Sequence, residues 1–313
     1  MKMRTVALVT TVLLALGFGG AGFEREPNDE SEHATRVVPR PAGDGRGVGV
    51  WGRIAPGDVD FFELWARAGD VLAVSLRARD AGEFDDPVIG IFAPGEDGPR
   101  SVNDDGGSGF LSRIAVPVDR SGRWKVAVSG FGDDAFDGGT HEEAFRYFLE
   151  LALVRDVARV GEGEGRNDEP AAAPRLPGLR GTRSFSIVSG RLTPGDVDYF
   201  RLPRRGGGFV SVSLFDRAGG EFNDSVLRLL DPEGEPLGED DDSGPGFLSN
   251  LVIKLSGCED AVLAVDGFDP DPDDEAPHGE EFDYDLVLTT IDRPGAAGRG
   301  PWRMLRCKAA GNG

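Results

Sequence analysis

The 313-residue chain has few residues suited to nucleophilic or metal-assisted catalysis, with only two cysteines and three histidines (His33, His141 and His278). It contains no Gly-x-Ser-x-Gly elbow, no His-Glu-x-x-His pair, no phosphate-cradling loop and no dinucleotide fingerprint. Paired carboxylates are abundant, so residue type alone does not exclude glycosidase-like chemistry, but every carboxylate-rich protein offers such pairs. The sequence therefore predicts a protein that is not an enzyme.

Positive charge is also scarce. The chain has 34 Lys and Arg against 55 Asp and Glu, which gives a formal net charge of −21. Nucleic acids and anionic membrane surfaces repel such a field, so neither is an expected partner. An acidic excess of this size either solvates the surface or holds hard cations.

Long stretches with helical periodicity are missing, whereas glycine (47) and proline (21) are plentiful. This composition favours many short strands joined by turns. β-rich runs follow Gly-containing turns, as at 71–76 and 209–214, and 148–153 alternates apolar and polar residues. About eight strands in each 125 residues or so is typical of an antiparallel sandwich, with very little helix.

The N-terminus has the features of an export signal. Lys2 and Arg4 precede an apolar run from Val6 to Leu16, and small residues dominate from Gly17 to Gly22. The apolar run is shorter than the roughly 20 residues of a membrane span, which favours cleavage near Gly22 over an uncleaved anchor. We therefore expect a secreted protein, extracellular or periplasmic, with no membrane attachment after cleavage.

An internal repeat decides the architecture. Segment 52–64 (GRIAPGDVDFFEL) recurs as 190–202 (GRLTPGDVDYFRL) with nine of thirteen residues identical, at a shift of 196 − 58 = 138 residues. Further matches follow in the same order, and they include Gly109–Ser112 with Gly246–Ser249 and His141 with His278. A period of this length corresponds to a whole domain rather than a solenoid unit.

The fold prediction is accordingly all-β, with two tandem antiparallel jelly-roll-like β-sandwich domains. The expected boundaries are a signal peptide (1–22), copy one (23–154), a linker (155–163), copy two (164–291) and a basic Gly-rich tail (292–313). Cys258 and Cys307 are the only cysteines, and an oxidising compartment favours a disulfide between them. A buried free thiol and an exposed tail cysteine are the alternatives.

An acidic motif opens copy one. The head segment Glu24–Glu30 (EREPNDE) is followed some thirty residues later by the turn Pro56–Asp60 (PGDVD). Asp58 and Asp60 are two apart, so on a strand their side chains point to the same side. Carboxylates together with an Asn amide oxygen form the ligand set that Ca²⁺ prefers, with six to eight oxygens. The alternative is turn chemistry alone, because Asp and Asn cap local backbone groups.

Several of these elements together resemble one family. Glu-Pro-Asn-Asp, Gly-Asp-Val-Asp-Phe-Phe, Asn103–Gly107 (NDDGG) and Tyr147-x-Leu149 occur in order, and this series is similar to the bacterial pre-peptidase C-terminal domain, a family that includes the collagen-binding modules of secreted clostridial collagenases. The resemblance covers both copies and implies a jelly-roll-like sandwich that binds calcium. The implied metal ligands in copy one are Glu24, Glu26, Asn28, Asp29, Asp58 and Asp60.

Copy two departs from this pattern. Its corresponding ligands are Asn167, Asp168, Asp196 and Asp198, but Gly165 stands in the position of Glu26, and Arg166 in that of Pro27. Losing a carboxylate and gaining a cation should weaken calcium binding. Glu162 or Glu164 would substitute only if the linker loops differently, so the second site is the doubtful one.

Other acidic clusters and the tryptophans allow two interpretations each. Asn103–Asp105 and Asp240–Asp242 are either a second cation site or solvated loops. Trp51, Trp65 and Trp124 have no aromatic counterparts in copy two, so they either form a ligand platform or fill a core. The matching histidines indicate a shared packing or capping role.

The function predicted from these features is a secreted, non-catalytic, calcium-binding β-sandwich protein with a structural or adhesion role. The alternative is an accessory module for a secreted peptidase or other hydrolase. Expected partners are calcium and an extracellular protein or polysaccharide.

Overall fold

The computed structural model divides into two compact units, unit one (Met1–Asp156) and unit two (Val157–Gly313). The residues that the structure describes are 21–42, 45–78, 86–104, 112–139, 141–155, 157–161, 167–176, 185–202, 209–217, 223–241, 248–254, 258, 260–269, 278–291 and 305–306.

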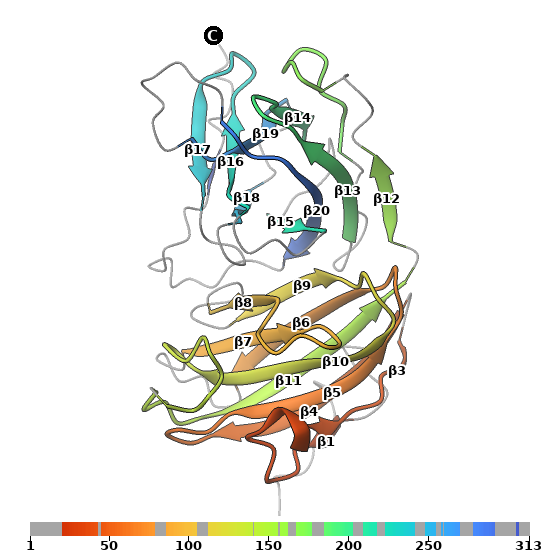
Figure 1. Cartoon of the computed structure of the whole chain (residues 1–313), viewed down its shortest axis with the longest axis vertical. Coiled ribbons are helices and arrows are strands. Elements are labelled where there is room, and N and C mark those ends of the chain that lie inside the picture. Colours follow the sequence, from red (N-terminus) through yellow and green to blue (C-terminus); the bar gives the residue numbers. More distant parts are fainter. Residues whose placement is uncertain are drawn as a thin grey trace, which may run out of the picture. The chain divides into compact units, whose positions relative to one another are not determined.

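Unit one is built from two sheets (Figure 1). The six-stranded sheet contains β1 (Ala21–Phe23), β3 (Arg40–Ala42), β4 (Gly45–Ile54), β6 (Val71–Ala78), β9 (Arg113–Pro117) and β11 (Phe145–Val154). Its order is β1-β4-β11-β6-β9, with β3 paired to β4. The five-stranded sheet contains β2 (Thr35–Arg36), β5 (Asp60–Ala66), β7 (Pro87–Phe92), β8 (Ser101–Asn103) and β10 (Gly122–Gly130), in the order β2-β5-β10-β7-β8.

Unit two repeats this plan. Its larger sheet contains β12 (Ala158–Gly161), β13 (Phe185–Leu192), β15 (Phe209–Asp216), β18 (Asn250–Lys254), β20 (Phe282–Ile291) and β21 (Leu305–Arg306), in the order β12-β13-β20-β15-β18-β21. Its smaller sheet contains β14 (Asp198–Arg201), β16 (Ser225–Leu230), β17 (Pro236–Asp240) and β19 (Val262–Gly267), in the order β14-β19-β16-β17.

The two units share one topology. The order β1-β4-β11-β6-β9 corresponds strand by strand to β12-β13-β20-β15-β18, and β5-β10-β7-β8 corresponds to β14-β19-β16-β17. Most neighbouring strands are antiparallel, and β1 and β12 each pair in parallel with the next long strand. The all-β sandwich prediction is confirmed, and the only helix among the described residues is the short 3-10 turn η1 (Ser31–His33).

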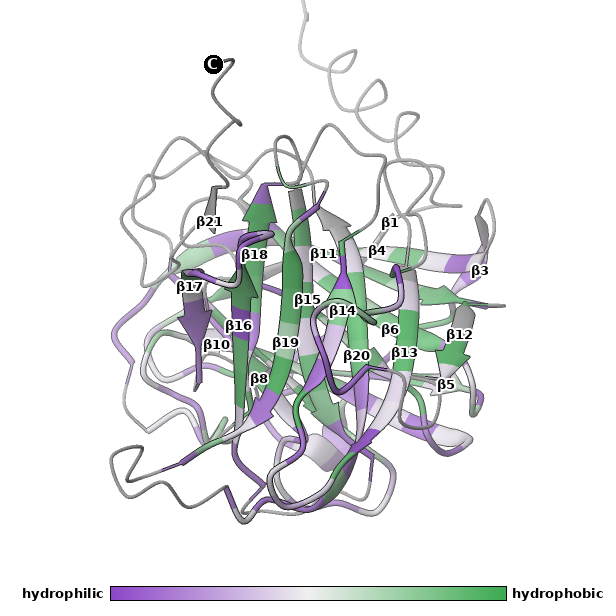
Figure 2. Cartoon of the chain, turned by 90° about the horizontal axis from the view of Figure 1, so that it is seen from above, coloured by the Kyte–Doolittle hydropathy of each residue, from purple (hydrophilic) through white to green (hydrophobic). Residues whose placement is uncertain are grey.

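Each core lies between the two sheets of its unit. The largest fully buried side chains include Trp124, Phe62 and Tyr147 in unit one, and Phe200 and Tyr284 in unit two. Burying a large apolar side chain contributes about 1.5–3 kcal/mol, so both cores are substantial. Figure 2 shows hydrophobic residues along β15, β16 and β19, whereas the edge strand β17 is hydrophilic and largely solvent-accessible.

The three tryptophans of copy one have different environments. Trp124 is fully buried and donates its indole N–H to the Arg120 carbonyl at 3.1 Å. Trp51 packs against Phe148 with ring centroids 4.5 Å apart, on the face of the larger sheet. Trp65 is 58% exposed. The core interpretation therefore holds for Trp124 and not for Trp65.

Two chain segments differ from the predicted boundaries. β12 lies within the stretch expected to be a linker, yet it hydrogen-bonds along β13 and belongs to the larger sheet of unit two. β1 begins at Ala21, so the last two residues of the predicted signal peptide are part of a strand, whereas residues 1–20 lie outside the described residues.

The tail returns to unit two through β21, which pairs in parallel with β18. Cys258 is buried and disulfide-bonded. Cys307, the other cysteine of the chain, directly follows β21 and lies outside the described residues. Within the described part of the chain, no helix is long and apolar enough to cross a membrane.

Candidate metal centre

The head segment of unit one runs along the sandwich and is fixed at several points. The Glu24 amide donates to the Trp51 carbonyl at 3.0 Å, and the Phe61 amide donates to the Asn28 carbonyl at 2.9 Å. These backbone bonds tie the segment to β4 and to β5, so its side chains project over the start of β5.

Three carboxylates converge there. Glu24, Glu26 and Asp60 each place an oxygen within 4.8 Å of the others, which is close enough to surround one ion. Asp60 is fully buried, Glu24 is half-buried and Glu26 is exposed, so the cluster runs from the sandwich interior to the surface. Carboxylates this close repel one another unless a proton or a cation lies between them.

A tyrosine hydroxyl anchors this cluster to the other sheet. The Tyr147 hydroxyl, from β11, lies 2.5 Å from Asp60 Oδ2 and 3.1 Å from Glu24 Oε2. The Arg53 amide also donates to Glu24, at 3.0 Å. Gly52 makes the approach possible, because a Cβ there would collide with both the Tyr147 ring and the Glu24 carboxylate.

The electrostatics of the cluster follow from its burial. Burial, with the nearby charge of Glu24, raises the pKa of Asp60 to about 9. The pKa of Glu24 is raised mainly by burial, and burial also raises the pKa of Glu26 and of Asp58. Ionising all of these groups together is unfavourable without a compensating positive charge.

Two buried side chains of this cluster also have polar atoms without a hydrogen-bond partner among the described residues. Asn28 is fully buried, and neither its amide nitrogen nor its side-chain oxygen finds a hydrogen-bond partner among the described residues. The same holds for Asp60 Oδ1. Leaving such groups unpaired costs about 1–3 kcal/mol each. An oxygen-preferring divalent cation would satisfy both oxygens and the clustered carboxylates, so the residues fit calcium.

Asp58 and Asp29 lie near this cluster without belonging to its closest group. Asp58 Oδ2 accepts the Ala55 amide at 3.0 Å, as a turn-capping aspartate does, and its charge adds to the raised pKa of Glu24, Glu26 and Asp60. Asp29 is exposed, and its charge acts on Glu26 and Asp58. The turn-chemistry alternative thus describes part of the role of Asp58.

Unit two builds a related cluster from different donors. Asp168, Asp196 and Asp198 place oxygens within 4.8 Å of one another, and Tyr284 of β20 donates to Asp198 Oδ2 at 2.6 Å. The Asn167 amide nitrogen donates to Asp198 Oδ1, unlike the unpartnered Asn28 amide. Glu162, Glu164, Gly165 and Arg166 lie outside the described residues.

The matching histidines hold the acidic turn in both units. His141 Nε2 lies 2.9 Å from the Asp58 carbonyl, and His278 Nε2 lies 2.8 Å from the Asp196 carbonyl. In return, the His141 carbonyl accepts the Gly57 amide at 3.3 Å. Both rings are buried. The sequence left packing and capping open, and the rings are both buried and hydrogen-bonded to the turn.

The other acidic clusters have backbone partners. Asn103 Oδ1 accepts the Arg113 amide at 3.1 Å, and Asp240 Oδ1 accepts the Asn250 amide at 2.8 Å. In each unit the bond joins the end of one strand to the start of the next strand along the chain, which belongs to the other sheet (β8 to β9, and β17 to β18). Asp105 and Asp242 lie outside the described residues.

Sequence reasoning did not single out the two tyrosines as parts of the site. Tyr147 and Tyr284 are 87 and 86 residues from the aspartates they contact. The signal was present in the repeated Phe-x-Tyr of the closing strand, at 145–147 and 282–284, but sequence spacing does not reveal such a contact.

No family model matches the chain, and no curated protein matches it. The resemblance to pre-peptidase C-terminal domains therefore stays a prediction.

Solved structures show distant similarity. PliG of Aeromonas hydrophila, a periplasmic inhibitor of g-type lysozyme, is 17% identical with a TM-score of 0.27, and the match covers 43% of this chain and 99% of PliG. The tandem CBM51 modules of a Streptococcus pneumoniae family 98 glycoside hydrolase are 9% identical with a TM-score of 0.22, covering 79% of this chain and 84% of theirs. Similarities at this level do not identify a ligand for this chain.

The raised pKa of Asp60 predicts a pH-dependent stability in chelating buffer. A carboxyl whose pKa is higher in the folded state stabilises the fold fully below its unfolded pKa, near 4, and this stability is lost as pH rises toward about 9. We expect the melting temperature to fall as pH rises across this window. Asp60→Asn should flatten the slope, because the amide cannot ionise.

The control for this prediction is Asp97→Asn, at an exposed carboxylate away from the cluster, which should leave the slope unchanged. Equal slopes for the unaltered chain and Asp60→Asn, measured by differential scanning calorimetry, would contradict the assignment.

The histidine cap predicts a stability loss that does not depend on metal. In chelator, His141→Leu should lower the free energy of unfolding by about 1 kcal/mol, because the Asp58 carbonyl loses its shorter hydrogen bond and keeps only the one from the Ser129 hydroxyl at 3.4 Å. His33→Leu, at an exposed histidine, should change it by less than about 0.5 kcal/mol. Denaturant titration measures both, and similar values for the two variants would refute the capping role.

Proposed function

We propose that this chain is a secreted, non-catalytic binding protein whose β-sandwich units are each stabilised by a calcium ion. The observation that carries the proposal is the repeated site: a buried aspartate at the start of β5 and of β14, bound by a tyrosine hydroxyl and joined by two further carboxylates. One such cluster would be compatible with turn chemistry. Two clusters at the same place in a duplicated fold, built partly from different residues, favour a shared ligand.

The donor set favours calcium over other metals. All candidate ligand atoms are carboxylate or amide oxygens: Glu24, Glu26, Asn28 and Asp60 in unit one, and Asp168, Asp196 and Asp198 in unit two. Hard cations take such oxygens, whereas zinc and copper prefer nitrogen and sulfur. The adjoining Asp29 and Asp58, and the Asn167 amide oxygen, would complete the shells.

Binding would stabilise the folded state by mass action, by about 2.7 kcal/mol when free calcium is 100 times the dissociation constant. Millimolar extracellular calcium makes even a weak site useful. The signal-like N-terminal segment supports an extracellular location, where calcium is at this concentration. A structural or adhesion role, or service as an accessory module to a secreted hydrolase, is compatible with the same calcium-supported fold.

Calorimetric titration of the secreted chain with calcium tests the proposal. We expect two binding events, with Asp60→Asn removing one and Asp198→Asn removing the other. Each loss should be matched by the loss of a calcium-dependent rise in melting temperature, because binding and stability are linked.

The matched control is Asp97→Asn, which should retain both events. A chain that shows no calcium heat and no shift of its melting temperature between calcium and chelator would refute the proposal.

A further inference from the structure

The outer face of the five-stranded sheet in unit one carries an exposed aromatic platform. Along β5, Phe62, Leu64 and Ala66 are buried in the core, so Phe61, Glu63 and Trp65 point to the outer face. A small apolar cluster with Phe92 and Phe136 covers Phe61, whereas the end of the face at Trp65 is open. Trp65 is 58% exposed, and Val38, which follows edge strand β2 alongside β5, is 61% exposed. A tryptophan this exposed is accessible to a ligand.

The surroundings of Trp65 are basic, although the chain as a whole is strongly acidic. Arg123 of β10 lies directly opposite Trp65, and Lys125 lies opposite Glu63. Arg36 of β2 lies beside Glu63 on its other side. Directly opposed residues share a face, so three cations and one carboxylate lie on the face of Trp65. Arg123 pairs with Glu63 at 3.0 Å, which leaves the charges of Arg36 and Lys125 in excess. A net charge of −21 makes this patch unusual for the molecule.

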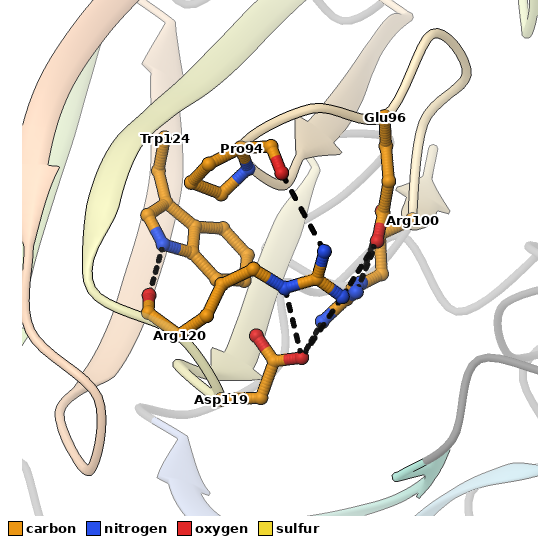
Figure 3. Close-up of polar contacts among 6 residues, drawn as sticks. All are labelled: Pro94, Glu96, Arg100, Asp119, Arg120 and Trp124. Carbon is orange, nitrogen blue, oxygen red and sulfur yellow. Dashed lines mark hydrogen bonds and ion pairs between the residues drawn. The ribbon is translucent and has the colours of Figure 1, made fainter.

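A polar cluster just before the start of β10 contains equal numbers of cations and anions, so it adds no net charge. Figure 3 shows Arg100 and Arg120 paired with Glu96 and Asp119, with Arg100 to Asp119 at 2.8 Å and Arg120 to Glu96 at 3.1 Å. Two cations thus meet two anions just before β10 begins. The positive charge of the outer face comes from the residues around Trp65.

Unit two repeats only one cation of this patch: Arg175, which bridges Arg201, corresponds to Arg36 beside Glu63. Pro203 stands at the repeat position of Trp65, Asp260 at that of Arg123 and Val262 at that of Lys125. Duplication kept the fold while these outward positions diverged, although the inward Leu64 and its match Leu202 are identical and both buried. Packing therefore does not require a tryptophan at position 65.

The chemistry of the patch selects one kind of partner. Backbone groups of a sheet face are used within the sheet, so a ligand meets only an indole ring, a valine and charged side chains. The C–H face of a sugar ring stacks on an indole, and guanidinium groups bind carboxylates with two parallel hydrogen bonds. A peptide that extends a sheet would instead need a free strand edge, and β2 is two residues long.

We propose that the Trp65 face, with Arg36, Arg123 and Lys125, binds an acidic polysaccharide that carries uronic acid carboxylates. The inference goes beyond calcium binding and does not depend on it. Trp65 is five residues along β5 from Asp60, which is about 17 Å on an extended strand.

Calorimetric titration of the full chain in calcium buffer with hyaluronan oligosaccharides, which carry one carboxylate per disaccharide, tests this proposal. We expect binding that weakens with salt and is lost when the carboxylates are reduced to alcohols. Trp65→Ala and Arg123→Ala should each lower the affinity about tenfold or more, because each removes a central anchor. Trp65→Phe should retain part of the affinity for the oligosaccharides, because it keeps an aromatic ring.

The matched control is Phe131→Ala, at another exposed aromatic of unit one, which should bind like the unaltered chain. Melting curves should coincide for all four variants, because the altered side chains are exposed. No binding, binding that Trp65→Ala leaves unchanged, or equal binding of carboxyl-reduced sugar would overturn the proposal. Binding of poly-glutamate in preference to the oligosaccharides would replace the polysaccharide with an acidic peptide.

Discussion

A hydrogen bond between a buried aspartate and a tyrosine hydroxyl links the two sheets in each unit, and the candidate metal centre depends on it. Asp60 lies on β5 and Tyr147 on β11, and Asp198 and Tyr284 repeat this pair on β14 and β20. A carboxylate inside an apolar sandwich is unfavourable unless hydrogen bonds and opposite charge compensate it. The tyrosine supplies one bond, and the head segment brings further ligands over the other side of the aspartate.

The two units surround the buried aspartate with different polar groups. In unit one, glutamates from the head segment approach Asp60, and the buried Asn28 side chain is unpartnered among the described residues. In unit two, the Asn167 amide donates to Asp198, and the neighbouring carboxylates are Asp168 and Asp196. Copy two has no carboxylate at Gly165, the match of Glu26, and its cluster instead uses Asp168 and Asp196, the matches of Asp29 and Asp58. The two clusters therefore differ in the donors they offer to a cation.

Much of this arrangement was predictable from sequence because it is repeated. The 138-residue shift predicted two domains of one fold, and the Pro-Gly-Asp-Val-Asp turn predicted where carboxylates gather. The exposure of Trp65 was not predicted, because the sequence left a ligand platform and a core position open. The tyrosine contacts were not predictable, since a bond across more than 80 residues depends on how two sheets pack. β12 was missed because its four residues become a strand only by pairing with β13.

The remaining parts of the site depend on geometry that sequence spacing does not encode. Nothing in the position of Gly52 indicates that Tyr147 and Glu24 both approach it, yet any side chain there would displace them. Similarly, the repeated histidines indicated a cap, but not that Nε2 lies at hydrogen-bond distance from the carbonyl of the acidic turn. The repeats in the sequence thus identified candidate residues, whereas the contacts that these residues make depend on tertiary packing.

The most direct measurement of the central claim is a crystal structure of the chain grown in calcium, with an anomalous difference map. We expect an ion at each cluster, about 2.3–2.6 Å from Asp60 Oδ1 and the Asn28 side-chain oxygen in unit one and from Asp198 in unit two. Water or a shared proton between Glu24 and Asp60, with no anomalous peak at either cluster, would contradict it.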